Sequence, residues 1–267
     1  MNKISATLLS CLLCSISLPT LGAEAYRHSR FEVGIGAVAL STPDFPGSSN
    51  SNNQLLPFPY VKYRGNRLQV DDGAEFRLFD TPDLKLAISG NGSLPSSADN
   101  PERVGMNKLD PTVELGPSLE YRIKHSYTSS LWLELPLRAS VTLTEDLDYV
   151  GLTTHPRIAW RLPAHFKYDW KLRFATGPVF SDSDYNGYYY DVGISEVSPT
   201  RAAYDAPQGY SSFRTDFTYS RRIGEYWLGG FFRHDLLSGS VIEDSSLVSK
   251  SSNLTAGFAM AWVFSEH

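Results

Sequence analysis

The chain has 267 residues, a formal net charge of −5, and a composition that is 42% hydrophobic and 13% aromatic. A mildly acidic balance argues against a nucleic-acid-binding protein, which normally carries a basic face. The mean hydropathy of −0.24 excludes a bundle of membrane helices, because only one segment is long and apolar enough to span a bilayer. The 15 Tyr and 14 Phe residues instead favour strands.

The single apolar segment, residues 4–23, follows one positive charge and ends in small residues. This pattern is typical of a secretory signal peptide. We expect cleavage after Ala23, with Ala25 as a second candidate site, so that residues 1–23 are the signal peptide and 24–267 form one exported domain. Both cysteines are removed with the signal, so the mature chain is not stabilised by disulfides.

The rest of the chain shows a two-residue period. Apolar residues alternate with charged or small ones over residues 113–123, 131–144 and 254–264, which indicates strands. These runs exceed the usual strand of a soluble sandwich and match the roughly 9–11 residues that a tilted strand needs to cross a bilayer. A soluble lipocalin-like barrel would give the same alternation with its faces reversed. The abundance of aromatic residues and the export signal favour an all-β, antiparallel transmembrane β-barrel.

We predict about twelve strands, an even number that places both termini in the periplasm. They span residues 31–40, 57–64, 67–79, 84–93, 112–124, 130–144, 149–162, 168–180, 185–194, 212–222, 226–237 and 252–264. Short turns at 65–66, 145–148, 181–184 and 223–225 are then periplasmic, and longer loops at 41–56, 195–209 and 238–251 lie outside. Residues 95–111 break this pattern as a long periplasmic loop, so either the strand count is wrong or this loop has a function.

Four prolines, Pro117, Pro136, Pro156 and Pro178, fall inside predicted strands. Each removes a hydrogen bond from the ladder. We therefore expect bulges or strand breaks, notably at Gly116-Pro117 and Gly177-Pro178.

Several motifs in order along the chain carry a family resemblance. They are Pro57-Phe58-Pro59-Tyr60-Val61, Arg103-Val104-Gly105-Met106-Asn107-Lys108-Leu109-Asp110, Glu114-Leu115-Gly116-Pro117, Leu135-Pro136-Leu137-Arg138 and Tyr188-Tyr189-Tyr190-Asp191-Val192. Together they resemble the MipA/OmpV family of MltA-interacting outer-membrane proteins. Asp191 departs from the family's usual Gly, and three residues follow the terminal aromatic Phe264.

This resemblance implies a barrel in the outer membrane of a Gram-negative bacterium. It also implies a scaffold that bridges a murein-degrading lytic transglycosylase and a murein synthase. Other members of the family are described as adhesins or as stress-responsive proteins, so membership indicates the fold better than the task.

No motif for catalysis or metal binding is evident. The six histidines form no H-x-H or H-E-x-x-H pair, and G-x-S-x-G is absent. Asp182-Ser183-Asp184-Tyr185-Asn186-Gly187 matches the start of a calcium loop, but Gly193 stands where the closing Glu belongs. We therefore interpret that segment as a polar turn, and we predict no enzyme activity, no cofactor and no metal.

The alternation places one set of charged residues in the lumen, where they line a pore or pair with one another. They are Glu114, Glu120, Glu134, Arg138, Lys171, Arg173, Arg214 and Asp216. A cluster of tyrosines at Tyr185, Tyr188, Tyr189 and Tyr190 has two interpretations. The rings either lie at the level of the lipid headgroups or form a protein-contact patch.

We therefore predict a non-catalytic scaffold in the outer-membrane bilayer. The long loop at 95–111 is its expected partner-contact surface, through Asn100, Arg103, Met106, Asn107 and Lys108. Two alternatives stay open. The mixed charges of the lumen would suit a small-solute pore, and the outer loops would suit a surface adhesin.

Overall fold

The computed structural model describes residues 30–71, 74–93, 100–162 and 170–266. The predicted signal peptide and its cleavage site lie outside these residues. No helix in the described part of the chain is long and apolar enough to cross a membrane.

The described residues form strands joined by turns, one α-helix and two short 3₁₀ helices. The strands are β1 (Arg30–Pro43), β2 (Ser51–Arg64), β3 (Leu68–Val70), β4 (Ala74–Asp80), β5 (Leu84–Gly92), β6 (Thr112–His125), β7 (Ser130–Thr142), β8 (Tyr149–Thr154), β9 (Arg157–Leu162), β10 (Trp170–Ser181), β11 (Gly209–Ile223), β12 (Tyr226–Leu236) and β13 (Ser252–Glu266). The helices are η1 (Pro101–Arg103), α1 (Ser183–Tyr190) and η2 (Ile194–Glu196).

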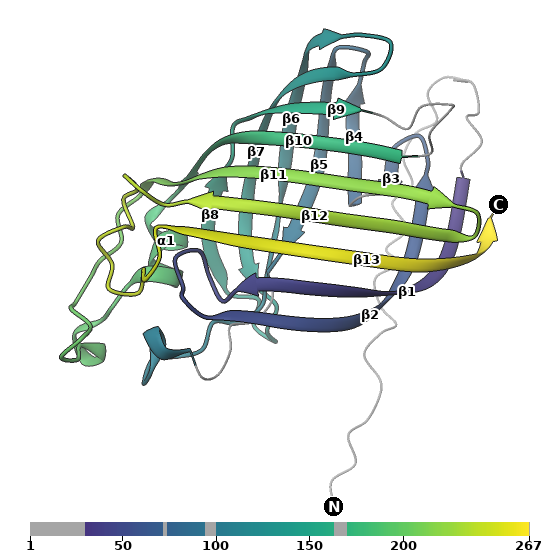
Figure 1. Cartoon of the computed structure of the whole chain (residues 1–267). Helices are drawn as coiled ribbons and strands as arrows, with labels where there is room; N and C mark the ends of the chain where they lie inside the picture. The colour runs from purple at the N-terminus through teal and green to yellow at the C-terminus, as the bar shows by residue number, and fades with distance from the viewer. Residues whose placement is uncertain (1–29, 72–73, 94–99, 163–169, 267) are drawn as a thin grey trace, which may run out of the picture.

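The sheet closes on itself. β1 pairs antiparallel with β2 on one side and with the last strand, β13, on the other, from Glu32↔Glu266 to Ser41↔Ala256. β8 and β9 both pair with β7 and with β10, so they are two halves of one strand. The structure is therefore a closed antiparallel barrel of twelve strands (Figure 1), as the alternation predicts.

The two faces of the wall differ in polarity. On β7, Leu135 is 39% exposed on the outside, whereas its neighbour Glu134 is 1% exposed and points inward. On β13, Phe258, Met260 and Trp262 are likewise exposed on the outer face. An apolar outside around a polar inside is the pattern of a membrane barrel, and it rejects the soluble lipocalin-like alternative.

Two of the predicted strands are wrong, although the total of twelve is right. Residues 67–79 are two strands, β3 and β4, which pair with each other. Residues 185–194 contain no long strand, because α1 occupies most of them. The prediction counts one strand too few at residues 67–79 and one too many at residues 185–194, so the total stays even. Every connection between these two segments is therefore predicted at the wrong end of the barrel.

The connections sort into two ends of the barrel. Short turns at residues 65–67, 81–83, 126–129 and 224–225 share one end with the end of β13, and we call this the turn end. Residues 44–50, 93–111, 143–148, 182–208 and 237–251 connect strands at the opposite end, the loop end, where Figure 1 shows α1 and the loops gathered.

The predicted sidedness of three connections is therefore wrong. Residues 95–111, 145–148 and 181–184 were placed with turn 65–66, but they lie at the loop end. The physical reason is the β3–β4 hairpin, which reverses the chain once more than the alternation revealed. The Asp72-Gly73 pair in the sequence is a turn signal that could have located this reversal.

The expected breaks at proline are confirmed. The β6–β7 ladder passes from Leu115↔Ala139 to Ser118↔Pro136 without pairing Gly116 and Pro117. β10 pairs with β9 up to Thr176 and resumes with β8 at Phe180, opposite the break at Pro156. At Gly177 a Cβ would lie 2.1 Å from the carbonyl oxygen of Pro156, so only glycine fits this close approach.

Pro57 and Pro59 have a different setting in β2. Neither can donate, yet both lie in an uninterrupted register with β1, so the hydrogen bonds to β1 come from the alternate residues. The two missing donors therefore face away from β1. On the side away from β1, only Tyr63 and Arg64 of β2 pair with β3. Residues 51–62 have no strand partner on that side among the described residues. An open edge is where a strand tolerates proline.

Replacing Leu135 with Arg tests the assignment of the outer face. A cation near the bilayer midplane destabilises a barrel by about 2–4 kcal/mol, which urea unfolding in lipid vesicles would measure. Thr218→Arg is the control, because Thr218 is half-buried on the lumen side of β11. An equal loss of stability in both variants would contradict the assignment.

Candidate functional site: the barrel lumen and its lid

A belt of ion pairs follows one wall of the lumen. At its centre the buried carboxylate of Glu134 on β7 accepts hydrogen bonds from Arg157 on β9 and Arg173 on β10, each at 2.5 Å, and a third from Arg161. Three guanidinium groups around one carboxylate stabilise a charge that would otherwise be costly to bury.

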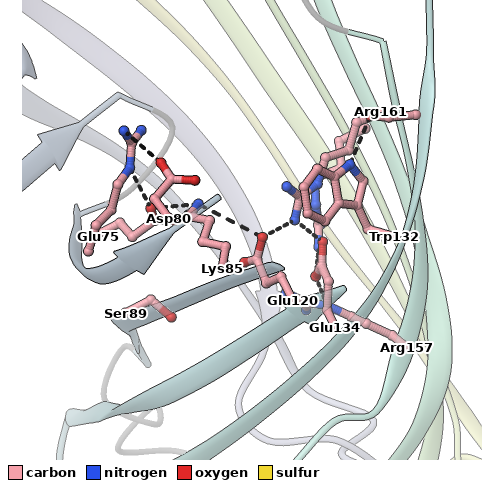
Figure 2. A network of polar contacts seen from close by, with 12 residues as sticks. Glu75, Asp80, Lys85, Ser89, Glu120, Trp132, Glu134, Arg157 and Arg161 are labelled. Atoms are coloured by element: carbon pink, nitrogen blue, oxygen red, sulfur yellow. Dashed lines mark hydrogen bonds and ion pairs between the residues drawn. The ribbon is translucent and has the colours of Figure 1, made fainter. Parts of the chain in front are cut away.

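The belt continues along the neighbouring strands, as Figure 2 shows. Arg161 also bonds Glu120 at 2.8 Å, and its guanidinium lies 4.9 Å from the ring centroid of Trp132. From Glu120 the contacts pass to Lys85 at 3.8 Å and on to Glu75 at 2.6 Å. The belt therefore ties β4, β5, β6, β7, β9 and β10 together from inside.

A second group of charges lies on β11 and β12. Asp216 bonds Arg233 at 2.8 Å, and Arg214 bonds Asp235 at 2.6 Å. These pairs join adjacent strands of the wall. They leave little uncompensated charge in this part of the lumen.

One ion pair crosses the lumen near the turn end. Lys171 of β10 lies 2.5 Å from Asp71, which follows β3 and also bonds Arg64 at 2.7 Å. β3 and β10 are on opposite sides of the ring of twelve strands. This contact therefore spans the interior and narrows it.

The inner face of the remaining wall, from β12 through β13 and β1 to β2, carries an apolar patch between its ion pairs. Trp227 packs against Tyr60 with ring centroids 5.3 Å apart and against Phe58 at 6.5 Å. Phe58 and Trp227 remain half-buried. Because these rings keep part of their surface accessible, the lumen retains space along this wall.

A lid closes the loop end, and we define it as residues 44–50, 100–111, 182–208 and 237–251. It has an apolar core of its own, formed with one residue of β8. The buried members are Phe45, Leu109, Val150, Tyr189, Tyr190, Val192, Ala206, Leu237, Ile242 and Leu247. Segments far apart in the sequence thus meet over the lumen, and the burial of their apolar side chains stabilises the lid.

Hydrogen bonds hold the lid segments in register. Arg201 donates to the carbonyl oxygens of Glu102 and Val104, both at 3.0 Å. Tyr190 donates to the carbonyl oxygen of Pro46 at 2.7 Å, and Ser245 donates to that of Tyr190 at 2.8 Å. No feature of the sequence pointed to Arg201, because its partners are backbone groups of a distant loop.

Glu102 joins two segments of the lid, its own loop and the β1–β2 loop. It accepts from the backbone N–H of Ser49 at 2.8 Å and from the hydroxyl of Ser48 at 3.0 Å. Partial burial raises the pKa of Glu102, but the hydrogen bonds from Ser49 and Ser48 outweigh it and hold the pKa below its ordinary value. This contact is therefore ionised at neutral pH.

The tyrosine cluster does not lie at the lipid headgroups. Tyr189 and Tyr190 are buried in the lid core, and the rings of Tyr188 and Tyr189 meet edge to face at 4.9 Å. Asp182 caps α1 by accepting from the backbone N–H of Tyr185 and also bonds the N–H of Leu152. The segment that matched the start of a calcium loop is thus a helix start, and no group of three potential metal ligands occurs within the described ranges.

The predicted partner-contact residues divide into two sets. Asn100 is buried and bonds Asp44 and Ser48, Arg103 donates to the carbonyl oxygen of Tyr189, and Met106 packs on the lid core. These three hold the lid together. Asn107 and Lys108 are exposed at the loop end.

The predicted lumen charges all lie inside the barrel. Glu120, Glu134, Arg138 and Asp216 are buried, and Glu114 accepts from the hydroxyl of Tyr185 at 2.9 Å. Most of them pair with other residues of the wall. Arg157 and Arg161 were missed, although the alternation of Arg157, Ala159 and Arg161 with apolar residues is visible once the strand is restarted after Pro156.

Comparison with known proteins addresses what kind of barrel this is. A family model described as MltA-interacting protein MipA matches residues 35–264. The chain belongs to the MipA family. No curated protein matches the sequence of this chain.

Solved outer-membrane proteins are similar to this MipA-family barrel at low identity. A bacterial polysaccharide outer membrane secretin has a TM-score of 0.43 and 11% identity, over 88% of this chain and 98% of the other. An outer membrane channel from Pseudomonas putida F1 has a TM-score of 0.39 and 13% identity, over 93% and 100%. The family match, together with the closed barrel and its apolar outer face, makes this protein an outer-membrane β-barrel of the MipA family.

Glu134→Gln tests the belt. The change leaves three lumen-facing arginines around a neutral side chain, and removing one partner of a buried ion pair typically costs about 3–5 kcal/mol. The unfolding free energy in urea would measure this loss. Glu75→Gln, at the more exposed end of the belt, should cost less than about 1 kcal/mol. An equal loss of unfolding free energy in both variants would contradict the central role of Glu134 in the belt.

Proposed function

We propose that this protein is a non-catalytic outer-membrane anchor that holds a lytic transglycosylase and a murein synthase at the periplasmic face. The family description supports this proposal, because it names an MltA-interacting protein. The closed loop end carries the argument. A barrel whose loop end is covered by a lid with its own apolar core and whose interior is ion-paired is better suited to anchoring than to free passage of solutes.

The turn end is the face we assign to the partner. In bacterial barrels the short turns face the periplasm and the longer loops face outward. Exposed Arg67, Lys124 and Arg221 lie at or beside three of these turns, and their side chains have no hydrogen-bond or ion-pair partner within the described part of the chain. Free cations at a rim favour an acidic partner surface.

The exposed acidic residues of the turn end are bonded within the protein. Asp80 pairs with Arg77 at 3.3 Å, Asp83 with Arg122 at 2.8 Å, and Glu225 accepts from the indole N–H of Trp262 at 3.1 Å. The bond from Trp262 leaves Glu225 charged, so within the described part of the turn end three unpaired cations outnumber this unpaired carboxylate. Asn107 and Lys108 remain a proposed contact only for a partner at the loop end.

Charge reversal at the turn end tests the proposal. The triple variant Arg67→Glu, Lys124→Glu, Arg221→Glu should lower the in-cell crosslinking of murein enzymes to the tagged barrel by about tenfold, since rim charges mainly govern association. Captured proteins would be identified by mass spectrometry against an abundance-matched porin.

Lys108→Glu is the matched control, because it reverses an exposed charge at the other end. It should leave capture unchanged. Loss of capture in Lys108→Glu alone would move the contact to the loop end, and recovery of assembly factors only would contradict the anchor.

Conductance separates the anchor from the pore alternative. With the lid in place, the purified barrel in planar bilayers should show no stable channel at neutral pH. A steady, ion-selective conductance from the intact protein would favour the small-solute pore instead.

A further inference from the structure

A pocket lies directly beneath the lid, between it and the charged wall. Its cavity volume is about 50 Å³. Wall residues Arg138, His155 and Ser181 line it from the side, and Tyr185 and Tyr190 of α1 line it from above. The anchor function proposed above makes no use of this space.

Three side chains that line the pocket are buried and have an atom without a partner. Arg138, His155 and Ser181 are 8%, 7% and 7% exposed. Arg138 Nη1, His155 Nε2 and Ser181 Oγ have no hydrogen-bond partner among the described residues. A buried polar atom left unpaired costs stability, and three around one cavity indicate that something absent from the structure completes them.

Arg138 is also the one lining arginine without a counter-ion among the described residues. Arg157 pairs with Glu134, Arg214 with Asp235 and Arg233 with Asp216. Arg138 has only the hydroxyl of Ser89, at 3.2 Å. Its positive charge is therefore available inside the pocket.

The contact with Arg157 determines which ring nitrogen of His155 carries the proton. Nδ1 lies 3.3 Å from Nη1 of Arg157, and a guanidinium can only donate. Nδ1 must then accept, so that in the neutral ring the proton is on Nε2. The unpartnered Nε2 is thus a donor, as are the guanidinium of Arg138 and the hydroxyl of Ser181.

From these donors we infer that the pocket binds a small oxyanion, with the guanidinium of Arg138 as its cation. A guanidinium matches the two oxygens of a carboxylate or phosphate, and the hydroxyl of Ser181 and the Nε2–H of His155 supply further hydrogen bonds. Glu114 also lines the pocket. It pairs with Ser140 in the ladder, one diagonal step from Arg138, and its carboxylate disfavours a second negative charge. The preferred ligand class is therefore a singly charged carboxylate.

Binding to the intact purified protein in detergent tests the site. Sodium acetate and sodium phosphate would be titrated by calorimetry at constant ionic strength against sodium chloride. We expect saturable binding of acetate with a rise in the thermal midpoint, and weaker binding of phosphate. Stronger binding of phosphate would keep the oxyanion site and reject the preference for a single charge. No saturable binding of either anion would overturn the proposal.

Two variants connect binding to the pocket. Arg138→Gln should weaken acetate binding by about tenfold or more, since a hydrogen bond to a charged group is worth roughly that factor. Arg67→Gln, an exposed change at the turn end, should leave it unchanged. Equal weakening in both variants would show nonspecific attraction and reject the site.

The unfolding midpoint of Arg138→Gln without acetate or phosphate tests whether Arg138 has a purely structural role. Removing an uncompensated buried cation should leave the unfolding midpoint in sodium chloride unchanged or raise it. A lower midpoint for Arg138→Gln in chloride alone would mean that Arg138 is a structural ion, and the proposal would then be wrong.

Discussion

The bilayer cannot hydrogen-bond to a backbone, and most of this structure follows from that constraint. A sheet in lipid must close so that its N–H and C=O groups pair with one another. The pairing of β1 with β13 joins the first strand to the last, and among the described residues the edge of β2 over residues 51–62 remains an exception. Once the sheet is closed, apolar side chains belong outside and polar side chains inside. Among the described residues, the apolar cluster enclosed by the wall is therefore small and centres on Tyr60, Ala261 and Val263.

The charges placed inside must then be neutralised in a confined space. Glu134 illustrates the solution, because three arginines from two neighbouring strands surround it. Each such contact also ties strands together, so the interior charges add to the stability of the closed ladder. Against this background of compensation, the unpaired Arg138 and the free cations of the turn end stand out as groups available to a ligand or a partner.

The lid is stabilised differently from the wall, because it lies beyond the strands and is surrounded by water. Its segments can bury apolar side chains against one another in water, and Tyr190, Leu237 and Ile242 do so. This is why tyrosines that would suit a headgroup belt are instead used as core residues. The lid also bears an excess of negative charge, whereas most exposed unpaired charges in the described part of the turn end are positive. Its acidic residues are Asp44, Glu102, Asp110, Asp182, Asp184, Asp191, Glu196, Asp205, Glu243 and Asp244, against Arg103, Lys108, Arg201 and Lys250. The two ends of the barrel thus present different charges to their surroundings.

The fold class, the outer and inner faces of the strands, the proline breaks and the lumen position of most charged residues could be predicted from the sequence alone. Each of these depends on a local period or on the chemistry of a single residue, such as the absent N–H of Pro156. Only the tertiary structure decided which end each loop occupies, what the tyrosines contact and which charges stay unpaired. The strand at 67–79 had to be divided and the one at 185–194 removed, and both corrections depend on long-range pairing and packing. Asn100, Arg103 and Met106 look like surface residues of a long loop, but their partners lie dozens of residues away. Periodicity fixes the side of a strand on which a residue lies, whereas its neighbours are fixed only when the barrel closes.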